Sequence, residues 1–213
     1  MESHIREPFN AFSHFLAAIA ALIGTIYLLI INWGQQNIWI AFLIYGLSVI
    51  SLFSSSALYH SSYGDDKKLL KLRKLDHSAI YLLIAGSYTP ICVYFFSGFW
   101  QWGLLAIVWS FAIIGIVVKL FIIRAPRWVT AGVYLVMGWL CVIGFNEIIN
   151  KMPIGAIVWL ALGGLFYTFG AIIYITKRIN ILPGVFGFHE IWHIFVILGA
   201  LSHFILMIRF INP

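Results

Sequence analysis

The chain has 213 residues, of which 62% are hydrophobic and only 9% are charged. A soluble globule of this size needs more polar surface than that, so the composition excludes an ordinary water-soluble domain. The net charge of +6 could suggest a nucleic-acid-binding protein. However, the sequence contains neither a glycine-rich phosphate loop nor a basic stripe interleaved with aromatic residues, so we expect no nucleic-acid partner.

Seven apolar segments recur along the chain, each long enough to cross the hydrocarbon core of a bilayer as a helix of about 20 residues. They cover residues 12–31, 38–60, 77–96, 102–122, 128–149, 154–176 and 188–210. No gap between them is large enough for a soluble domain. The sequence therefore predicts an all-α integral membrane protein in which residues 1–213 form a single domain of seven transmembrane helices.

Lysine and arginine are concentrated in alternate connections between these spans. Five lie in the connection 61–76, three in 119–127 and two in 177–187, whereas the other three connections share one lysine. By the positive-inside rule, the N-terminus is predicted to be cytoplasmic and the C-terminus to lie outside. This orientation is opposite to that of rhodopsin-like receptors, so seven helices alone do not indicate a G-protein-coupled receptor.

Ionisable side chains are costly inside a membrane, so each one within a span suggests a function. In the predicted orientation, polar side chains from four spans share one depth near the cytoplasmic end. They are His14, His60, Asp76, His189 and His193. Such a cluster indicates a buried site at this end of the bundle.

His189 and His193 are four residues apart, so on a helix they can present two imidazoles to one ion. His60 would be a third ligand, and catalytic zinc sites commonly have three protein ligands and a water. Asp76 could contact the ion through that water or accept its proton, and Ser56 could orient a ligand or a substrate oxygen. The pattern predicts a zinc centre, and the alternative is that the histidines only hydrogen-bond between helices.

The residues from His189 to His193 also fit the H-E-x-x-H pattern of zinc proteases, in which Glu190 would be the base. The alternative role of Glu190 is an interfacial carboxylate favoured by the helix dipole. We favour this second interpretation because Asp76 competes for the role of base. His203 lies about 15 Å further along the same helix, so it cannot share the site.

Four motifs together resemble the hemolysin III family of bacteria, which belongs with the progestin and adipoQ receptors, including the adiponectin receptors. They are NAFSH at 10–14, SALYH at 56–60, KLDHSAIYLLIAGSYTP at 74–90 and HEIWHIFVILGALSH at 189–203. The resemblance covers nearly the whole chain. It implies an adiponectin receptor-like bundle with an inward N-terminus and a zinc ion held by His60, His189 and His193, with Asp76 contacting it through water.

The resemblance implies three functions, because eukaryotic members look like zinc-dependent hydrolases of ceramide-type lipids and bacterial members are linked to haemolysis and membrane homeostasis. Our leading hypothesis is a ceramidase-like hydrolase that cleaves a lipid amide or ester reached from the inner leaflet, with Asp76 and Ser56 as catalytic residues. The alternatives are a non-enzymatic sensor or homeostasis protein with structural zinc, and a haemolytic pore. We expect membrane lipids as partners and a multi-pass location in the bacterial plasma membrane.

Overall fold

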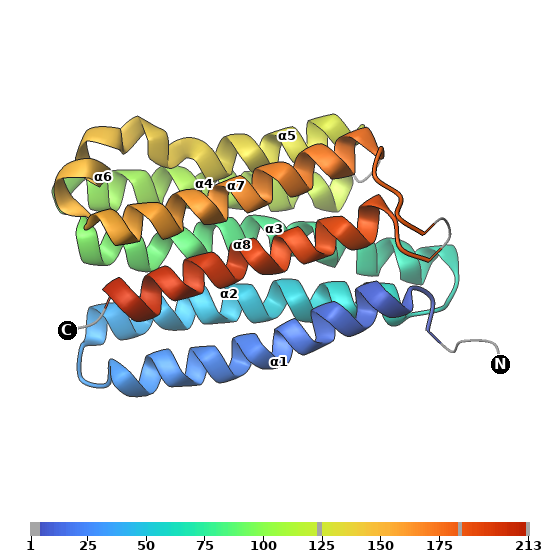
Figure 1. The fold of residues 1–213 in the computed structure, drawn as a ribbon, viewed down its shortest axis with the longest axis horizontal. Coiled ribbons are helices and arrows are strands. Elements are labelled where there is room, and N and C mark those ends of the chain that lie inside the picture. The colour runs from blue at the N-terminus through green and yellow to red at the C-terminus, as the bar shows by residue number, and fades with distance from the viewer. Residues whose placement is uncertain (1–4, 123–124, 183–184, 212–213) are drawn as a thin grey trace.

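The computed structural model describes residues 5–122, 125–182 and 185–211, and within these ranges the protein is built of helices. The elements are α1 (Pro8–Ile31), α2 (Gln36–Ser61), α3 (Asp66–Phe95), α4 (Gly98–Phe121), α5 (Arg127–Gly138), the 3₁₀ helix η1 (Trp139–Gly144), α6 (Phe145–Lys151), α7 (Ile154–Thr176) and α8 (Phe188–Phe210) (Figure 1). Seven helical segments are long and apolar enough to cross a membrane. This confirms the predicted fold class, and helices are expected because a chain in lipid must satisfy its own backbone hydrogen bonds.

The third helix begins at Asp66, eleven residues before the span predicted from hydropathy. The side chain of Asp65 caps this helix by accepting a hydrogen bond from the backbone N–H of Lys68 (2.8 Å). The residues that follow are mostly leucine, lysine and arginine, which favour helix although they are too polar to span a membrane. Most of the basic connection is therefore helical, and Asp76 lies inside a helix and not at its start.

The fifth predicted span is broken: α5, η1 and α6 follow one another where hydropathy predicts one continuous helix. The side chain of Tyr88 on α3 lies at the break. Its hydroxyl donates to the carbonyl oxygens of Met137 (3.2 Å) and Gly138 (2.7 Å) and accepts from the N–H of Cys141 (2.9 Å). A neighbouring helix thus satisfies backbone groups at the point where the α-helical pattern is interrupted.

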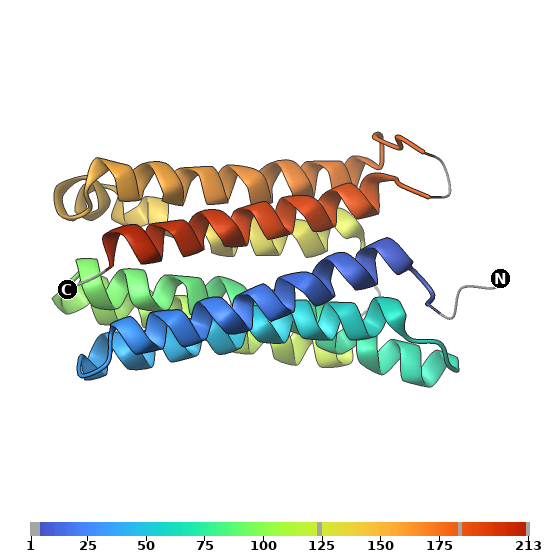
Figure 2. The ribbon, with the colours of Figure 1, turned by 60° about the horizontal axis from the view of Figure 1, so that its bottom comes forward.

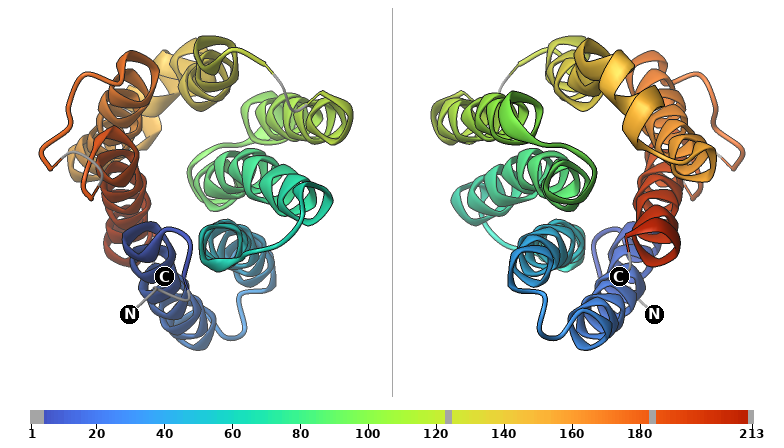
Figure 3. Two further views of the ribbon diagram at one scale, coloured as in Figure 1. Left: turned by 90° about the vertical axis from the view of Figure 1, so that its right-hand side faces the viewer. Right: turned by 90° about the vertical axis from the view of Figure 1, so that its left-hand side faces the viewer.

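The helices form a ring when the bundle is viewed along its length (Figure 3). Helices α1 to α4 pack against one another in chain order, α5 packs against α7, and α7 packs against α8. Figure 2 shows α8 between α7 and α1, and contacts between α1 and α8 join the first and last helices. We call the end at which α1, α3, α5 and α8 begin the N-terminal end of the bundle.

The interior of the ring holds a cavity of about 360 Å³. Its wall is formed almost entirely by apolar side chains of α3, α5, η1, α7 and α8, among them Ile84, Leu135, Leu160 and Val196. Many large apolar side chains also lie on the outer surface of the helices. An apolar outside is expected of a bundle that faces lipid, whereas an apolar cavity of this size is typical of a site for a small ligand.

Candidate metal centre

Three histidines meet at the N-terminal end of the bundle. His60 is at the end of α2, and His189 and His193 are on the first two turns of α8. One ring nitrogen from each lies within 4.8 Å of the others. His60 and His193 are almost fully buried, with 2% and 4% of their surface exposed. The structure thus brings together the three residues that the sequence predicted as ligands.

The donor set fits a zinc-type ion. Ligand nitrogens around a tetrahedral zinc ion are roughly 3.4 Å apart, so only small movements would be needed to close the three rings on one ion. Imidazole is a ligand that zinc prefers. Nδ1 of His193 is buried and has no hydrogen-bond partner within the described ranges, which is a costly arrangement unless something else binds it. Two buried imidazoles and one half-buried imidazole, with ring nitrogens close together, could therefore hold a metal ion.

Ser56 and Asp76 lie beside the three histidines. All five residues line one cavity of about 50 Å³, which has room for at least one water molecule. The Ser56 hydroxyl and the carboxyl group of Asp76 lie near each other in the wall of this cavity. The carboxylate oxygens of Asp76 are not as close to the three histidine nitrogens as these nitrogens are to one another. The contact of Asp76 with a metal ion through a water molecule stays a prediction, and the cavity has room for that water.

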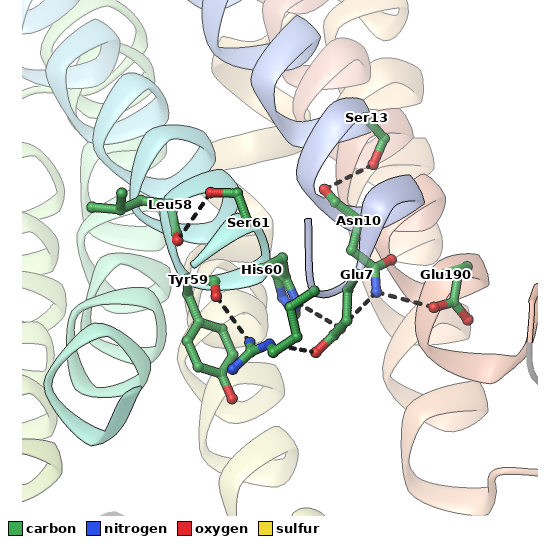
Figure 4. Close-up of polar contacts among 9 residues, drawn as sticks. Glu7, Asn10, Ser13, Leu58, Tyr59, His60, Ser61 and Glu190 are labelled. Carbon is green, nitrogen blue, oxygen red and sulfur yellow. Dashed lines mark hydrogen bonds and ion pairs between the residues drawn. The ribbon is translucent and has the colours of Figure 1, made fainter. Parts of the chain in front are cut away.

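Glu7 belongs to the site, although sequence reasoning did not find it. It directly precedes α1, and its Oε2 lies 2.7 Å from Nδ1 of His60 (Figure 4). Burial alone would raise the pKa of this carboxyl group, but hydrogen bonding and charge attraction to His60 outweigh burial and lower the pKa to about 2. Glu7 is therefore ionised at neutral pH, and Nδ1 of His60 is the donor.

Glu190 of the H-E-x-x-H pattern is engaged elsewhere. Its Oε2 accepts from the backbone N–H of Gly187 (2.8 Å), which caps the start of α8, and its Oε1 accepts from the amide of Asn10 (3.0 Å). The same amide donates to Glu7 (3.0 Å), so Asn10 joins two carboxylates from the two ends of the chain. These contacts support the interpretation of Glu190 as a carboxylate that stabilises the start of α8 over that of a catalytic base, and they add a backbone cap to the expected dipole interaction.

The two remaining histidines of interest occupy different environments. His14 on α1 is 3% exposed, stacks on His193 with 3.9 Å between ring centroids and lines the small cavity. His203 lines the large cavity, where it packs close to Gly163 and next to Tyr167. The structure thus agrees that His14 belongs to this end of the bundle and that His203 is separate from the three-histidine group.

The two cavities adjoin each other. Leu52, Ile80, Tyr134, Trp192 and Val196 line both of them. A molecule with a long apolar part could therefore occupy the large cavity and place a polar group beside the histidines.

Comparison with known proteins identifies the family. A family model described as "Haemolysin-III related" matches residues 3–204. This chain belongs to that family. The "Hemolysin-3 homolog" of Bacillus subtilis (strain 168) is 36% identical over 198 residues, covering 92% of this chain and 89% of that protein. The "Hemolysin-3" of Bacillus cereus is 36% identical over 209 residues, covering 96% and 91%.

A more distant relative extends the relationship. The "Adiponectin receptor protein" of Drosophila melanogaster is 30% identical over 220 residues, covering 93% of this chain and 49% of that protein. Both parts of the predicted resemblance are thereby confirmed. Together with the seven apolar helices, the family identifies this haemolysin-III-related protein as a multi-pass protein of the bacterial cell membrane.

Proposed function

We propose that this haemolysin-III-related protein is a zinc-dependent hydrolase that cleaves an amide or ester bond of a membrane lipid. One observation carries the proposal. Three histidine nitrogens converge at a small cavity whose wall also carries Asp76 and Ser56, and this cavity adjoins an apolar cavity of about 360 Å³. The first supplies a place for chemistry and the second a place for an apolar chain.

The side chains around the small cavity have distinct roles in this proposal. His60, His189 and His193 hold the zinc ion, which when bound supplies a Lewis acid and lowers the pKa of water. Asp76, which lies near Ser56 in the wall of the small cavity, takes the proton of the attacking water and passes it to the leaving amine or alcohol. The apolar walls of the large cavity hold the acyl chain and exclude water from it.

The bundle is oriented with its N-terminal end toward the cytoplasm in this proposal. The connections and helix ends at this end carry most of the basic residues, including those in the first turns of α3 and at the start of α5. The positive-inside rule favours this orientation. The lipid is then reached from the inner leaflet.

A structural role of the metal is the second candidate. The three histidines come from α2 and α8. Glu7, which directly precedes α1, contacts His60, and His14 on α1 stacks on His193, so α1 also packs against this site. An ion at this point would tie the first, second and last helices together and stabilise the fold without turning over a lipid. A haemolytic pore is the third candidate, supported only by the names of the Bacillus relatives, and leakage from liposomes would test it.

Turnover and metal content, measured on the same preparations, separate these candidates. The wild type, Asp76→Asn, His189→Ala and Glu190→Gln would be assayed with ceramide and with phospholipid esters in mixed micelles. We expect Asp76→Asn to keep zinc but lose about 10²–10⁴-fold in turnover, as is usual for a lost general base. His189→Ala should lose both zinc and turnover, and Glu190→Gln should keep both. Zinc in a wild type that hydrolyses none of these lipids would favour the structural role.

A further inference from the structure

The contact between Glu7 and His60 places a carboxylate on the far side of a metal-binding imidazole. The distance from Nδ1 of His60 to Oε2 of Glu7 is 2.7 Å, and 2% of the His60 side chain and 35% of the Glu7 side chain are exposed. Because Nδ1 is committed to this bond, Nε2 is the nitrogen of His60 that remains for an ion. Carboxylates in this position fix the tautomer and orientation of metal-binding histidines and increase their basicity.

We propose that Glu7 is a positioning residue of the metal centre, which holds His60 as the Nδ1–H tautomer with Nε2 turned toward His189 and His193. The proposal rests on the proposed function only in requiring an ion at the three histidines. It does not require that the protein hydrolyses a lipid.

The segment that carries Glu7 is itself held in place on the end of α2. The backbone N–H of Glu7 donates to the carbonyl oxygen of His60 (3.0 Å). Arg6 donates to the carbonyl oxygen of Tyr59 (2.9 Å) and lies over the ring of Tyr59, 4.3 Å from its centroid. Backbone and side-chain contacts thus hold Arg6 and Glu7 against Tyr59 and His60 at the end of α2.

Both oxygens of the Glu7 carboxylate have partners. Oε1 lies 3.3 Å from Nε of Arg6, and Oε2 accepts from Asn10 (3.0 Å) as well as from His60. A carboxylate with partners on both oxygens has little freedom to rotate, so it can define the direction of the imidazole it binds.

His60 differs from the other two ligands in this respect. Neither His189 nor His193 hydrogen-bonds a carboxylate in the part of the chain that the structure describes, and Nδ1 of His193 has no partner there. Both of these histidines lie on one helix, whose i, i+4 spacing already sets their relative direction. His60 comes from a different helix, so this spacing does not set its direction. A separate hydrogen bond, such as the one to Glu7, is needed to orient its ring.

The test compares zinc affinity in Glu7→Gln and Glu190→Gln with that of the wild type, by competition with a chelator. Glutamine keeps the length of the side chain but is a weaker, uncharged acceptor. We expect Glu7→Gln to bind zinc about 10–100-fold more weakly, as is usual when such a partner is lost. Glu190→Gln is the matched control, since Glu190 also binds Asn10 but does not touch His60. It should change affinity by less than about threefold.

A second readout needs no metal. ¹⁵N NMR of metal-free protein labelled at histidine reports the tautomer of His60, assigned by comparison with His60→Ala. The wild type should show the Nδ1–H form, and Glu7→Gln should show both tautomers. Glu7→Asp keeps the charge and should recover part of the zinc affinity, and thermal melting of the metal-free variants checks that each is folded.

Equal zinc affinity in wild type and Glu7→Gln would overturn the proposal, as would an equal loss in Glu190→Gln, an unchanged His60 tautomer or a wild type that binds no zinc. Lipid turnover is a separate result. Absence of turnover together with weaker zinc binding in Glu7→Gln would remove the hydrolase and leave the role of Glu7 intact.

Discussion

The two cavities inside this bundle share part of one wall but differ in the rest of their lining. The small one, about 50 Å³, is lined by histidines, Asp76 and Ser56 at the N-terminal end. The large one, about 360 Å³, is lined almost entirely by apolar side chains deeper in the ring. The difference indicates a division of tasks, because polar groups in a membrane protein are costly and are kept where they act, whereas apolar walls are sufficient to hold a chain.

The largest expected effect is on turnover, and it comes from a change to one side chain of the small cavity. In Asp76→Asn we expect turnover to fall by about 10²–10⁴-fold, because the amide cannot accept a proton from water. Zinc content should stay at the wild-type value, since the three histidines remain. Paired turnover assays and elemental analysis check this. Loss of zinc together with turnover would instead place Asp76 among the groups that hold the ion.

A change in the large cavity should affect binding and leave the metal in place. Leu160→Trp adds volume to a wall residue of this cavity. We expect KM for a long-chain lipid to rise about tenfold, because a lost or blocked apolar contact of about 1.4 kcal/mol corresponds to that factor. Zinc content should not change.

The matched control for that variant is Leu162→Trp, two residues away on α7, where the side chain is exposed on the outside. It should have wild-type KM. If both variants raise KM equally, the effect comes from α7 as a whole and the large cavity is not the chain-binding site.

A third prediction concerns the wall that the large cavity shares with the broken fifth span. Tyr88→Phe removes the hydroxyl that serves the backbone of Met137, Gly138 and Cys141. Unsatisfied buried groups cost about 1–3 kcal/mol each, so we expect a lower thermal midpoint in detergent or nanodiscs. Tyr27→Phe on the exposed face of α1 is the control and should melt like the wild type.

The smallest expected effect is on stability through the metal. Chelation of zinc should lower the thermal midpoint of the wild type, because an ion held by these histidines would join α2 to α8. The same treatment of His189→Ala should have no effect, since that variant has no ion to lose. A chelator effect of equal size in both proteins would show that the chelator acts on the bundle and not on this site.

The sequence predicted the parts of this architecture that depend on local patterns. Hydropathy was enough to find the seven spans, and the i, i+4 spacing of His189 and His193 was enough to place two candidate ligands on one face. His60 followed because the alternating direction of the spans put it at the same depth.

The sequence failed where a contact crosses between helices or where two patterns compete. Tyr88 lies far along the chain from the break it supports, so nothing near residues 139–144 predicted a 3₁₀ helix. The start of α3 was placed too late because hydropathy marks the membrane boundary and helix propensity marks the helix boundary, and these differ at Asp66. The two cavities are products of tertiary packing and had no local signal.

Glu7 shows the same limit within the site. It lies in a short polar stretch that looks like a solvated tail, and its partner His60 is 53 residues away. The signals that could have drawn attention to it are the proline that follows at the start of α1 and the spacing of three residues to Asn10, both typical of a structured helix start.

The central claim is that three histidines from two helices hold a zinc ion, and elemental analysis of detergent-purified protein tests it most directly. We predict one zinc per wild-type chain, and loss of that zinc in both His60→Ala and His189→Ala, because each variant removes a ligand from a different helix. A carefully prepared wild type that contains no zinc would contradict the account and leave these histidines as groups that pack the helices together.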